Sequence, residues 1–337
     1  MTVRYRIQED ETAVPVALTE VGAKAEKLLS ALQPSSATGG PEPEDDSTIT
    51  APVGRQVNFF GPARSGIGRY RDERPNAQEK ATVLLLHGWA GTAELNWSHV
   101  YAPLVSAGYR VLAPDLAGHG QGAKDVAFTI DGSADAAARL VRDSGVARVV
   151  VVGHSMGGSI ALVFARRHPD LVLGLVLMAT QASWPGIPPT WFLRVAGRLA
   201  TAAAKPVLRW GARSLLSADT DRNRRIEDEL SHTSIPHLVQ ALVELRGFNA
   251  EPWLSQVPFP TVVLVTTKDK LVAPERQRLL AAGIRGAMVM KVDIGHSDPA
   301  SKPGIFPERM VAAIGQLAAT GDDEGERQSP DAVWVHA

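Results

Sequence analysis

The sequence contains no cysteine among its 337 residues. This absence excludes disulfides, thiolate zinc sites and cysteine nucleophiles. The sequence also lacks an excess of charge of either sign, with 35 lysines and arginines against 36 acidic residues and a formal net charge of −1. Nucleic-acid-binding proteins usually present a strongly basic surface, so we expect no nucleic-acid partner.

Long apolar runs are missing as well. No stretch of about 18 apolar residues, which a membrane-spanning helix needs, occurs in the sequence. The N-terminal segment MTVRYRIQEDETAV is charged and lacks the apolar core of a secretory signal. Together these two absences predict a cytoplasmic protein.

The composition that is present is ordinary for a globular protein, with 45% hydrophobic and 21% charged residues. A chain of this length can bury a substantial core. It suits either one large α/β domain with an insertion or two ordinary domains. We favour the single large domain.

Residues 1–50 are predicted to form an appendage outside that domain. Within them, residues 18–32 space their apolar side chains as an amphipathic helix does. Residues 33–48 are rich in Pro, Gly, Ser and acidic residues, which favours a flexible linker. At the other end, residues 319–337 have the composition of a polar, mobile tail, so the domain is expected at residues 51–318.

Short apolar runs alternate with helical segments through this domain. Strands that alternate with helices predict an α/β fold, in which a mostly parallel sheet is covered by helices on both faces. The helical segments include residues 134–145 and 157–170. The runs expected to form buried strands are TVLLLHG (82–88), YRVLAPD (109–115), ARVVVVGHS (147–155), LVLGLVLMA (171–179), PTVVLVTTKD (260–269) and GAMVMKVD (286–293).

The alternation is interrupted between about residues 181 and 255. Pro and Trp are plentiful there and no strand pattern is evident. Doubly wound folds bind their ligands at the carboxyl ends of the strands. We therefore interpret this stretch as an insertion that forms a helical cap over that edge of the sheet.

A candidate nucleophile stands at the end of the third of these strands. Residues 153–157 fit the pattern G-x-S-x-G, with Ser155 at its centre, directly after ARVVVV and before SIALVFARRH. In such a nucleophile elbow the serine occupies a strained backbone conformation at a sharp turn, and the flanking glycines let strand and helix approach closely. The turn aims the hydroxyl out of the sheet.

A serine hydroxyl needs a base, and the base needs an acceptor. His296 is the best candidate base, because it lies in a loop after the last expected strand. Asp269 is the candidate acid, since it directly follows the preceding strand, whereas the loop TQASW after residue 179 holds no carboxylate. Asp293 and Asp298 are the alternative acids.

The other histidines are expected to be structural. His87 and His119 belong to glycine-flanked loops and are predicted to shape the site without moving protons. His154 adjoins the serine in sequence and should point away from it. His168, before a proline, is expected to end a helix.

These motifs together resemble the α/β-hydrolase superfamily, in its lipase/esterase-like branch with a helical cap. The resemblance covers about residues 54–317 and includes LLLHGWAGT, VLAPDLAGHGQG, VVGHSMGGSIALVFARRHPDLVLGLVLMA, TTKDKLVAP and IGHSDP. It implies a Ser155–His296–Asp269 triad, with an oxyanion hole formed by the backbone N–H groups of Trp89 and Met156. Family members that open epoxides or remove halide have aspartate at the elbow, so Ser155 argues for acyl chemistry.

The sequence thus predicts a serine hydrolase that cleaves carboxylic esters through an acyl-enzyme, without a metal or organic cofactor. The proposed cap is rich in tryptophan and aliphatic residues, which favours a mainly apolar small-molecule substrate. These residues could equally pack the cap against the core. The candidate substrate-binding residues are Trp184, Trp191, Phe192 and Trp210.

Several alternatives remain open at this point. The same triad serves acyltransfer, thioester hydrolysis, carbon–carbon bond hydrolysis and perhydrolysis, and a non-catalytic binding protein could share the fold. Cations within residues 194–213 form a basic stripe that could touch an anionic membrane surface or simply face solvent. The oligomeric state is undetermined.

Overall fold

The structure is a computed structural model. The residues that it describes are 56–57, 67–190, 228–301 and 304–322. The expected N-terminal helix and linker therefore lie outside the described residues, as does the chain beyond Asp322. The last helix continues to Asp322 and so includes the first residues of the segment predicted as a tail.

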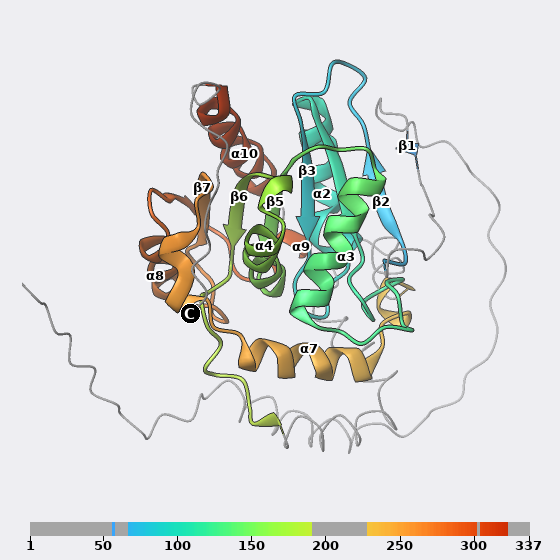
Figure 1. Cartoon of the computed structure of the whole chain (residues 1–337), viewed down its shortest axis with the longest axis vertical. Helices are drawn as coiled ribbons and strands as arrows, with labels where there is room; N and C mark the ends of the chain where they lie inside the picture. The colour runs from blue at the N-terminus through green and yellow to red at the C-terminus, as the bar shows by residue number, and fades with distance from the viewer. Residues whose placement is uncertain (1–55, 58–66, 191–227, 302–303, 323–337) are drawn as a thin grey trace, which may run out of the picture. The chain divides into compact units, whose positions relative to one another are not determined.

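A single sheet of eight strands organises the described residues (Figure 1). Its strand order is β1-β2-β4-β3-β5-β6-β7-β8. β2 is antiparallel to both of its neighbours, and all other strand pairs are parallel. The strands are β1 (Gln56–Val57), β2 (Tyr70–Glu73), β3 (Ala81–Leu86), β4 (Tyr109–Pro114), β5 (Val149–His154), β6 (Val172–Met178), β7 (Thr261–Thr266) and β8 (Met288–Val292). All six strands expected from the apolar runs are present.

Helices connect the parallel strands, and two further helices follow the last strand, β8. They are α2 (Ala93–Ser106), α3 (Ile130–Asp143), α4 (Met156–Arg167), α7 (Ile235–Gly247), α8 (Pro274–Gly283), α9 (Asp298–Ser301) and α10 (Phe306–Asp322), with short 3₁₀ segments η1 (Pro169–Leu171) and η2 (Glu251–Gln256). The two helices expected at residues 134–145 and 157–170 correspond to α3 and α4.

Successive side chains of the strands pack into two different cores, because neighbouring residues of a strand point to opposite faces. In β5, Val149 and Val151 join α3, α4 and α8 on one face. Val150 and Val152 join α2 and α10 on the other face. Burial on both faces explains why these strands are continuous apolar runs, and it confirms the predicted α/β fold.

β2 is a strand that the apolar pattern did not predict. Its sequence is YRDE, and it pairs antiparallel with β4 near the sheet edge. Its charges have partners in neighbouring elements: Asp72 accepts from Arg110 of β4 at 2.7 and 2.8 Å, and Arg71 pairs with Glu94 of α2. A polar strand is stable here because these ion pairs compensate its charges.

The insertion expected near residues 181–255 lies between β6 and β7. Its described part contains α7 and η2 and no strand beyond one isolated bridge, Ser183 with Asn249. Figure 1 shows α7 lying across the end of the sheet to which the arrows of β3 and β6 point. Residues 191–227 fall outside the described residues, so the complete cap stays a prediction.

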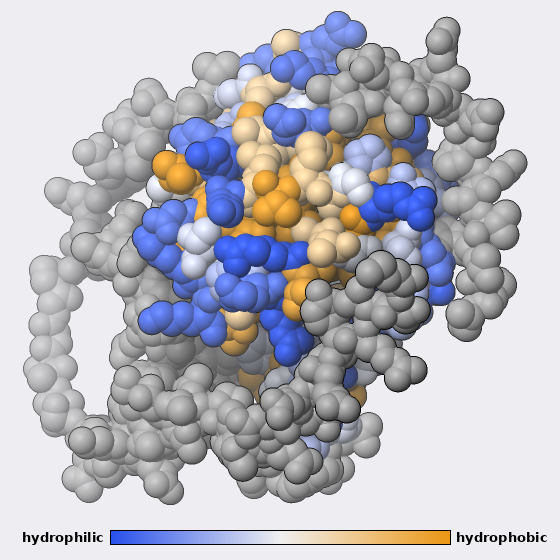
Figure 2. Space-filling view, turned by 90° about the vertical axis from the view of Figure 1, so that its left-hand side faces the viewer, coloured by the Kyte–Doolittle hydropathy of each residue, from blue (hydrophilic) through white to orange (hydrophobic). Residues whose placement is uncertain are grey.

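The side of the molecule that carries α8 and α10 faces the viewer in Figure 2. Hydrophobic surface there is interrupted by hydrophilic side chains. Leu279 of α8 and Val289 of β8 are 68% and 47% exposed. Within the described ranges, no helix is long and apolar enough to span a membrane. The cytoplasmic location stays a prediction.

Candidate active site

Ser155 lies at a sharp turn between β5 and α4, as the G-x-S-x-G pattern predicts. Its backbone has φ 54° and ψ −119°, in a region that non-glycine residues rarely adopt. A Cβ added to Gly153 would lie 2.4 Å from the carbonyl oxygen of Gly157, and one added to Gly157 would lie 2.1 Å from that of Leu86. Glycine is therefore required on both sides of the serine by close approach of backbone.

The structure brings Ser155, His296 and Asp269 into one hydrogen-bonded chain. The Ser155 hydroxyl donates to His296 Nε2 at 3.0 Å, and His296 Nδ1 donates to Asp269 Oδ2 at 2.9 Å. The three residues follow β5, β8 and β7, whose carboxyl ends lie at the same edge of the sheet. Ser155 and Asp269 are buried, and the His296 side chain is 14% exposed.

The two alternative acids do not contact the imidazole of His296 in this way. Asp293 accepts from Thr267 Oγ1 at 2.8 Å and pairs with Lys268 at 2.7 Å. Asp298 Oδ2 instead accepts from the backbone N–H of Gly295 at 2.7 Å. Of the three acids weighed from the sequence, Asp269 is thus the hydrogen-bond acceptor for His296 Nδ1.

Donors converge on Asp269 and hold its negative charge. Its Oδ1 accepts from the N–H groups of Leu271 and Val272, each at 2.8 Å, and its Oδ2 also accepts from Thr266 Oγ1 at 3.0 Å. Burial by itself would raise the pKa of Asp269. The hydrogen bond and charge of His296, together with these backbone donors, outweigh burial and bring its pKa below the usual value.

Gln277 of α8 holds the turn that carries Asp269, a role that the sequence pattern did not predict. Its side chain is fully buried. Its Nε2 donates to Thr266 Oγ1 and to the Val272 carbonyl, both at 2.8 Å, and its Oε1 accepts from the Thr266 N–H at 3.0 Å. Gln277 therefore fixes both the end of β7 and the turn that carries Asp269.

The candidate oxyanion-hole residues stand on either side of Ser155. Met156 is the first residue of α4, where helical N–H groups have no partner within the helix. Trp89 lies in the loop between β3 and α2, which is shaped by Ala90 with φ 57° and by a bond from Gly91 N–H to the Gly88 carbonyl. Their role as oxyanion donors stays a prediction.

Three buried histidines surround the site in the neutral form. Burial lowers the pKa of His87 to about 4. Burial, followed by the neighbouring His87, lowers that of His119 to about 3. Burial, followed by the charge of His296, lowers that of His154 to about 3. His87 Nε2 accepts from the Leu116 N–H at 2.9 Å while its Nδ1 donates to the Gly88 carbonyl at 2.8 Å, a pattern that needs the neutral ring.

The insertion is attached to the core by polar contacts along α7. The Trp89 indole donates to the Leu238 carbonyl at 2.9 Å. The N–H groups of Phe128 and Ile130 donate to the side chains of Gln240 and Glu244 at 3.1 and 3.3 Å. These contacts join α7 to the loop that carries Trp89 and to the segment that leads into α3.

The candidate substrate-binding residues are only partly described. Trp184 is 8% exposed, and its indole donates to Ser159 Oγ of α4 at 3.0 Å. The structure therefore places Trp184 in the packed core, and its contact with substrate stays a prediction. Trp191, Phe192 and Trp210 lie outside the described residues, as does the basic stripe of residues 194–213.

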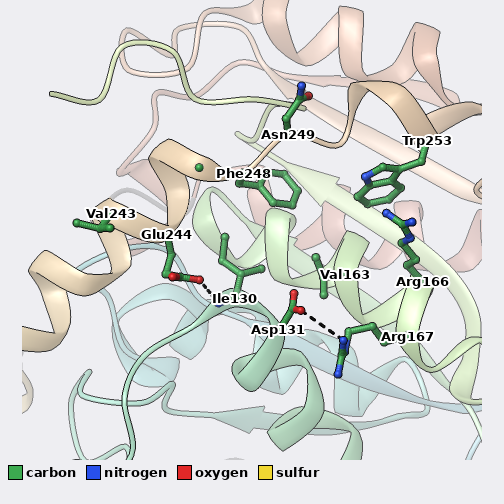
Figure 3. Close-up of a pocket in the computed structure, with 11 residues that line it drawn as sticks. Ile130, Asp131, Val163, Arg166, Arg167, Val243, Glu244, Phe248, Asn249 and Trp253 are labelled. Carbon is green, nitrogen blue, oxygen red and sulfur yellow. Dashed lines mark hydrogen bonds and ion pairs between the residues drawn. The ribbon is translucent and has the colours of Figure 1, made fainter. Parts of the chain in front are cut away.

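A separate groove of about 810 Å³ lies between α3, α4, α7 and η2 (Figure 3). Some of its charged groups contact other residues of its walls: Arg167 contacts Asp131 at 3.3 Å, and Arg166 lies over the Trp253 ring at 5.0 Å. Ser155 does not line it. In the part of the chain that the structure describes, no cluster of three or more His, Asp or Glu side chains could hold a metal ion.

The chain matches the family model described as the alpha/beta hydrolase fold over residues 81–303. The chain belongs to the α/β hydrolase family. An uncharacterised protein of Mycobacterium tuberculosis is 39% identical to this chain over 98 residues, which are 29% of this chain and 28% of the relative. This alignment thus spans less than a third of that relative's length.

Two further matches cover most of the length of the protein to which this chain is similar. Pimeloyl-(acyl-carrier protein) methyl ester esterase of Neisseria meningitidis is 28% identical over 235 residues, covering 67% of this chain and 89% of the relative. A solved structure of a thermophilic esterase from Thermogutta terrifontis, with malate bound, is 26% identical with a TM-score of 0.61, covering 79% of this chain and 99% of that one. The family and these relatives support a hydrolase.

Proposed function

We propose that this hydrolase cleaves carboxylic esters of a mainly apolar small molecule. Ser155 is the nucleophile, His296 is the base, and Asp269 is the carboxylate that orients and stabilises His296. The observation that carries the proposal is the continuous hydrogen-bonded chain from the Asp269 carboxylate through His296 to the Ser155 hydroxyl. The hydrogen-bonded series ends at Ser155, whose strained turn directs the hydroxyl beyond the edge of the sheet.

In the first half of the reaction, Ser155 Oγ attacks the ester carbonyl carbon while His296 Nε2 accepts the hydroxyl proton. Asp269 stabilises the imidazolium that results. The carbonyl oxygen becomes an oxyanion, which accepts hydrogen bonds from the N–H groups of Trp89 and Met156. His296 then donates its proton to the departing alkoxide, leaving an acyl group on Ser155.

In the second half, a water molecule replaces the alcohol. His296 accepts a proton from this water, which attacks the acyl carbon and forms a second oxyanion. Collapse of that intermediate releases the carboxylic acid and returns the proton to Ser155. The names of the relatives, a methyl ester esterase and a thermophilic esterase, support an oxygen ester as the bond that is cleaved.

The experiment that tests this proposal measures hydrolysis of p-nitrophenyl esters from acetyl to palmitoyl. We expect activity on dissolved esters, and Ser155→Ala should lower kcat on the order of 10⁶-fold. Ser231→Ala is the matched control, because Ser231 is exposed and its hydroxyl donates to the Asp228 carbonyl. The control should retain wild-type activity.

Two other outcomes would change the assignment. A preference for long chains with higher activity on emulsified substrate would favour a lipase that contacts a lipid surface. A wild-type protein that reacts with a serine-directed phosphonate at Ser155 yet hydrolyses no ester would contradict ester hydrolysis and favour acyl transfer or cleavage of a carbon–carbon bond.

A further inference from the structure

Three hydrogen bonds connect the loop of His296 to the loop of Trp89 behind the serine. His154 Nε2 lies 3.0 Å from the backbone carbonyl oxygen of His296. On the other side of the ring, His154 Nδ1 lies 3.0 Å from Asn96 Nδ2. Asn96 Oδ1 in turn accepts from the backbone N–H of Gly88 at 3.0 Å. We call this chain the His154–Asn96 link.

Only one assignment of hydrogens satisfies all three bonds. The Gly88 N–H can only donate, so the amide oxygen of Asn96 must face it and the amide NH₂ must face His154 Nδ1. Nδ1 is then the acceptor, and the ring proton lies on Nε2. That proton is donated to the carbonyl of His296, so every polar atom in the chain has a matching partner.

The link is buried and closely packed. His154 is 4% exposed and Asn96 is 6% exposed. A Cβ on Gly88 would lie 2.9 Å from His154 Nδ1, and one on Gly91 would lie 2.5 Å from Asn96 Oδ1. The low pKa of His154, about 3, which burial and then the charge of His296 produce, keeps the ring neutral at ordinary pH. The hydrogen-bond partners then place the single ring proton on Nε2.

We propose that His154 and Asn96 are positioning residues that fix the distance between the base loop and the oxyanion loop across Ser155. His154 precedes the serine directly, so the same short turn carries the nucleophile and the group that holds the other two parts of the site. The His154 ring packs beside the His296 ring, with the two centroids 5.0 Å apart, and its hydrogen bond goes to the His296 backbone carbonyl and not to the imidazole. The proposal rests on the proposed function, because it assigns both residues to that same site.

Two substitutions of His154 separate the two ends of the link. Asparagine places an oxygen near the position of Nδ1 and so keeps the bond to Asn96, while it loses the donor to His296. Glutamine places a nitrogen near the position of Nε2 and so keeps the donor to His296. Asn96→Leu removes the bond to Gly88 while preserving the volume of the side chain.

The measurement is kcat for each active site that a phosphonate titrates, so that misfolded protein is not counted. We expect His154→Asn to lower this kcat by about tenfold to hundredfold with little change in KM, because displacement of a catalytic group by about 1 Å has that effect. His154→Gln should lower kcat by less than His154→Asn, because it keeps the donor to the His296 carbonyl and loses only the bond to Asn96. A trifluoromethyl ketone forms a tetrahedral adduct whose oxyanion would occupy the proposed oxyanion hole. Asn96→Leu should therefore raise the inhibition constant of this ketone by a larger factor than it raises KM.

A double-mutant cycle tests whether the two residues act as one unit. His154→Asn combined with Asn96→Leu should lower kcat by less than the product of the single effects, since either change already breaks the link. His168→Gln is the matched control. His168 contacts Asp135 at 2.8 Å at the other end of α4, and its replacement should leave kcat unchanged.

Two results would overturn the proposal. One is wild-type kcat per titrated site in folded variants of His154 and Asn96. The other is a loss confined to thermal stability or to the fraction of titratable sites, which would indicate a purely structural role. Failure of the proposed function is a different result, namely no ester hydrolysis by the wild type. In that case the rate of phosphonate labelling at Ser155 still reports whether the link positions His296.

Discussion

The candidate site buries titratable groups in two different ways on its two sides. On the side of β7 and β8, Asp269 is buried as an anion, and backbone, hydroxyl and imidazole donors surround its carboxylate. On the side of β4, β3 and β5, the histidines His87, His119 and His154 are buried as neutral rings. Their environment supplies one or two hydrogen-bond partners to each ring.

The difference shows which protonation state each region of the fold stabilises. A carboxylate that accepts several hydrogen bonds keeps its charge despite burial, and that charge is needed where an imidazolium forms. A buried imidazole without an anionic partner keeps its neutral form and can serve as a fixed donor and acceptor.

Asp269→Asn removes the charge on the anionic side while keeping the shape of the side chain. We expect kcat to fall about 10⁴-fold with KM nearly unchanged, because the amide neither stabilises the imidazolium nor fixes the tautomer of His296. Ester hydrolysis per titrated site measures this loss. Asp293→Asn is the matched control, since Asp293 is an exposed acid paired with Lys268. A loss below tenfold in Asp269→Asn would remove this residue from the proposed triad.

The neutral side should make the folded state sensitive to acid. The three histidines have a pKa of about 4 for His87 and about 3 for His119 and His154 in the folded chain, against about 6.5 when unfolded. Between these values the unfolded chain binds more protons, so stability is full above pH 6.5 and is lost as the pH falls towards 4. Each histidine contributes about 1.4 kcal/mol per pH unit, about 4 kcal/mol per unit for the three.

Urea unfolding at pH 7, 6 and 5 measures this slope. His119→Gln should reduce it by the contribution of one histidine. Asp269 contributes in a different window, because its lowered pKa gives stability that is present above the ordinary aspartate pKa and is lost only as the pH falls through the folded value. A free energy of unfolding that does not change between pH 7 and 5 would contradict neutral burial of the histidines.

Gln277→Leu should have the smallest effect of the three. The substitution leaves the Thr266 N–H and the Val272 carbonyl without the partner that Gln277 provides, and a buried unpaired group costs about 1–3 kcal/mol in the free energy of unfolding. Leu279→Gln, on the exposed face of the same helix, should change stability by about 0.5 kcal/mol or less. Equal stability of the two variants would show that Gln277 does not hold the turn of Asp269.

Much of the fold is predictable because the sheet is covered on both faces. Strands buried in this way are mostly apolar, so β3 to β7 are visible as nearly continuous apolar runs in the sequence. β8, at the edge of the sheet, shows the same pattern although Val289 and Lys291 are exposed. β2 escapes this reasoning. Three of its four residues are charged. Their partners, such as Arg110 and Glu94, belong to a strand and a helix that are neighbours in space but distant in the sequence, so a local sequence pattern does not connect them.

The site divides in a similar way. Ser155, Asp269 and His296 could be proposed because each follows a recognisable strand, and parallel strands end at one edge. Asn96 and Gln277 could not, since polar residues within helices ordinarily face solvent. The spacing along each helix nevertheless indicates that these two side chains are buried. Asn96 shares a helix face with Thr92 and Val100, which are buried. Gln277 lies three and four residues before Leu280 and Ala281, which are also buried.

Aromatic composition, in contrast, does not distinguish packing from recognition. Trp184 was a candidate for substrate contact, and the structure gives its indole a partner in the core, Ser159. A buried tryptophan usually finds such a partner for its N–H. The same composition therefore fits a cap that merely packs and a cap that selects a substrate.

The positive φ of Ser155 also has a consequence for stability. At this position glycine is the residue that relaxes the backbone at no steric penalty, and glycine would remove the hydroxyl proposed as the nucleophile. A Ser155→Gly substitution would therefore be expected to stabilise the folded protein while removing this hydroxyl. Under the proposed function, the serine at this position is explained by its chemistry and not by the stability of the folded chain.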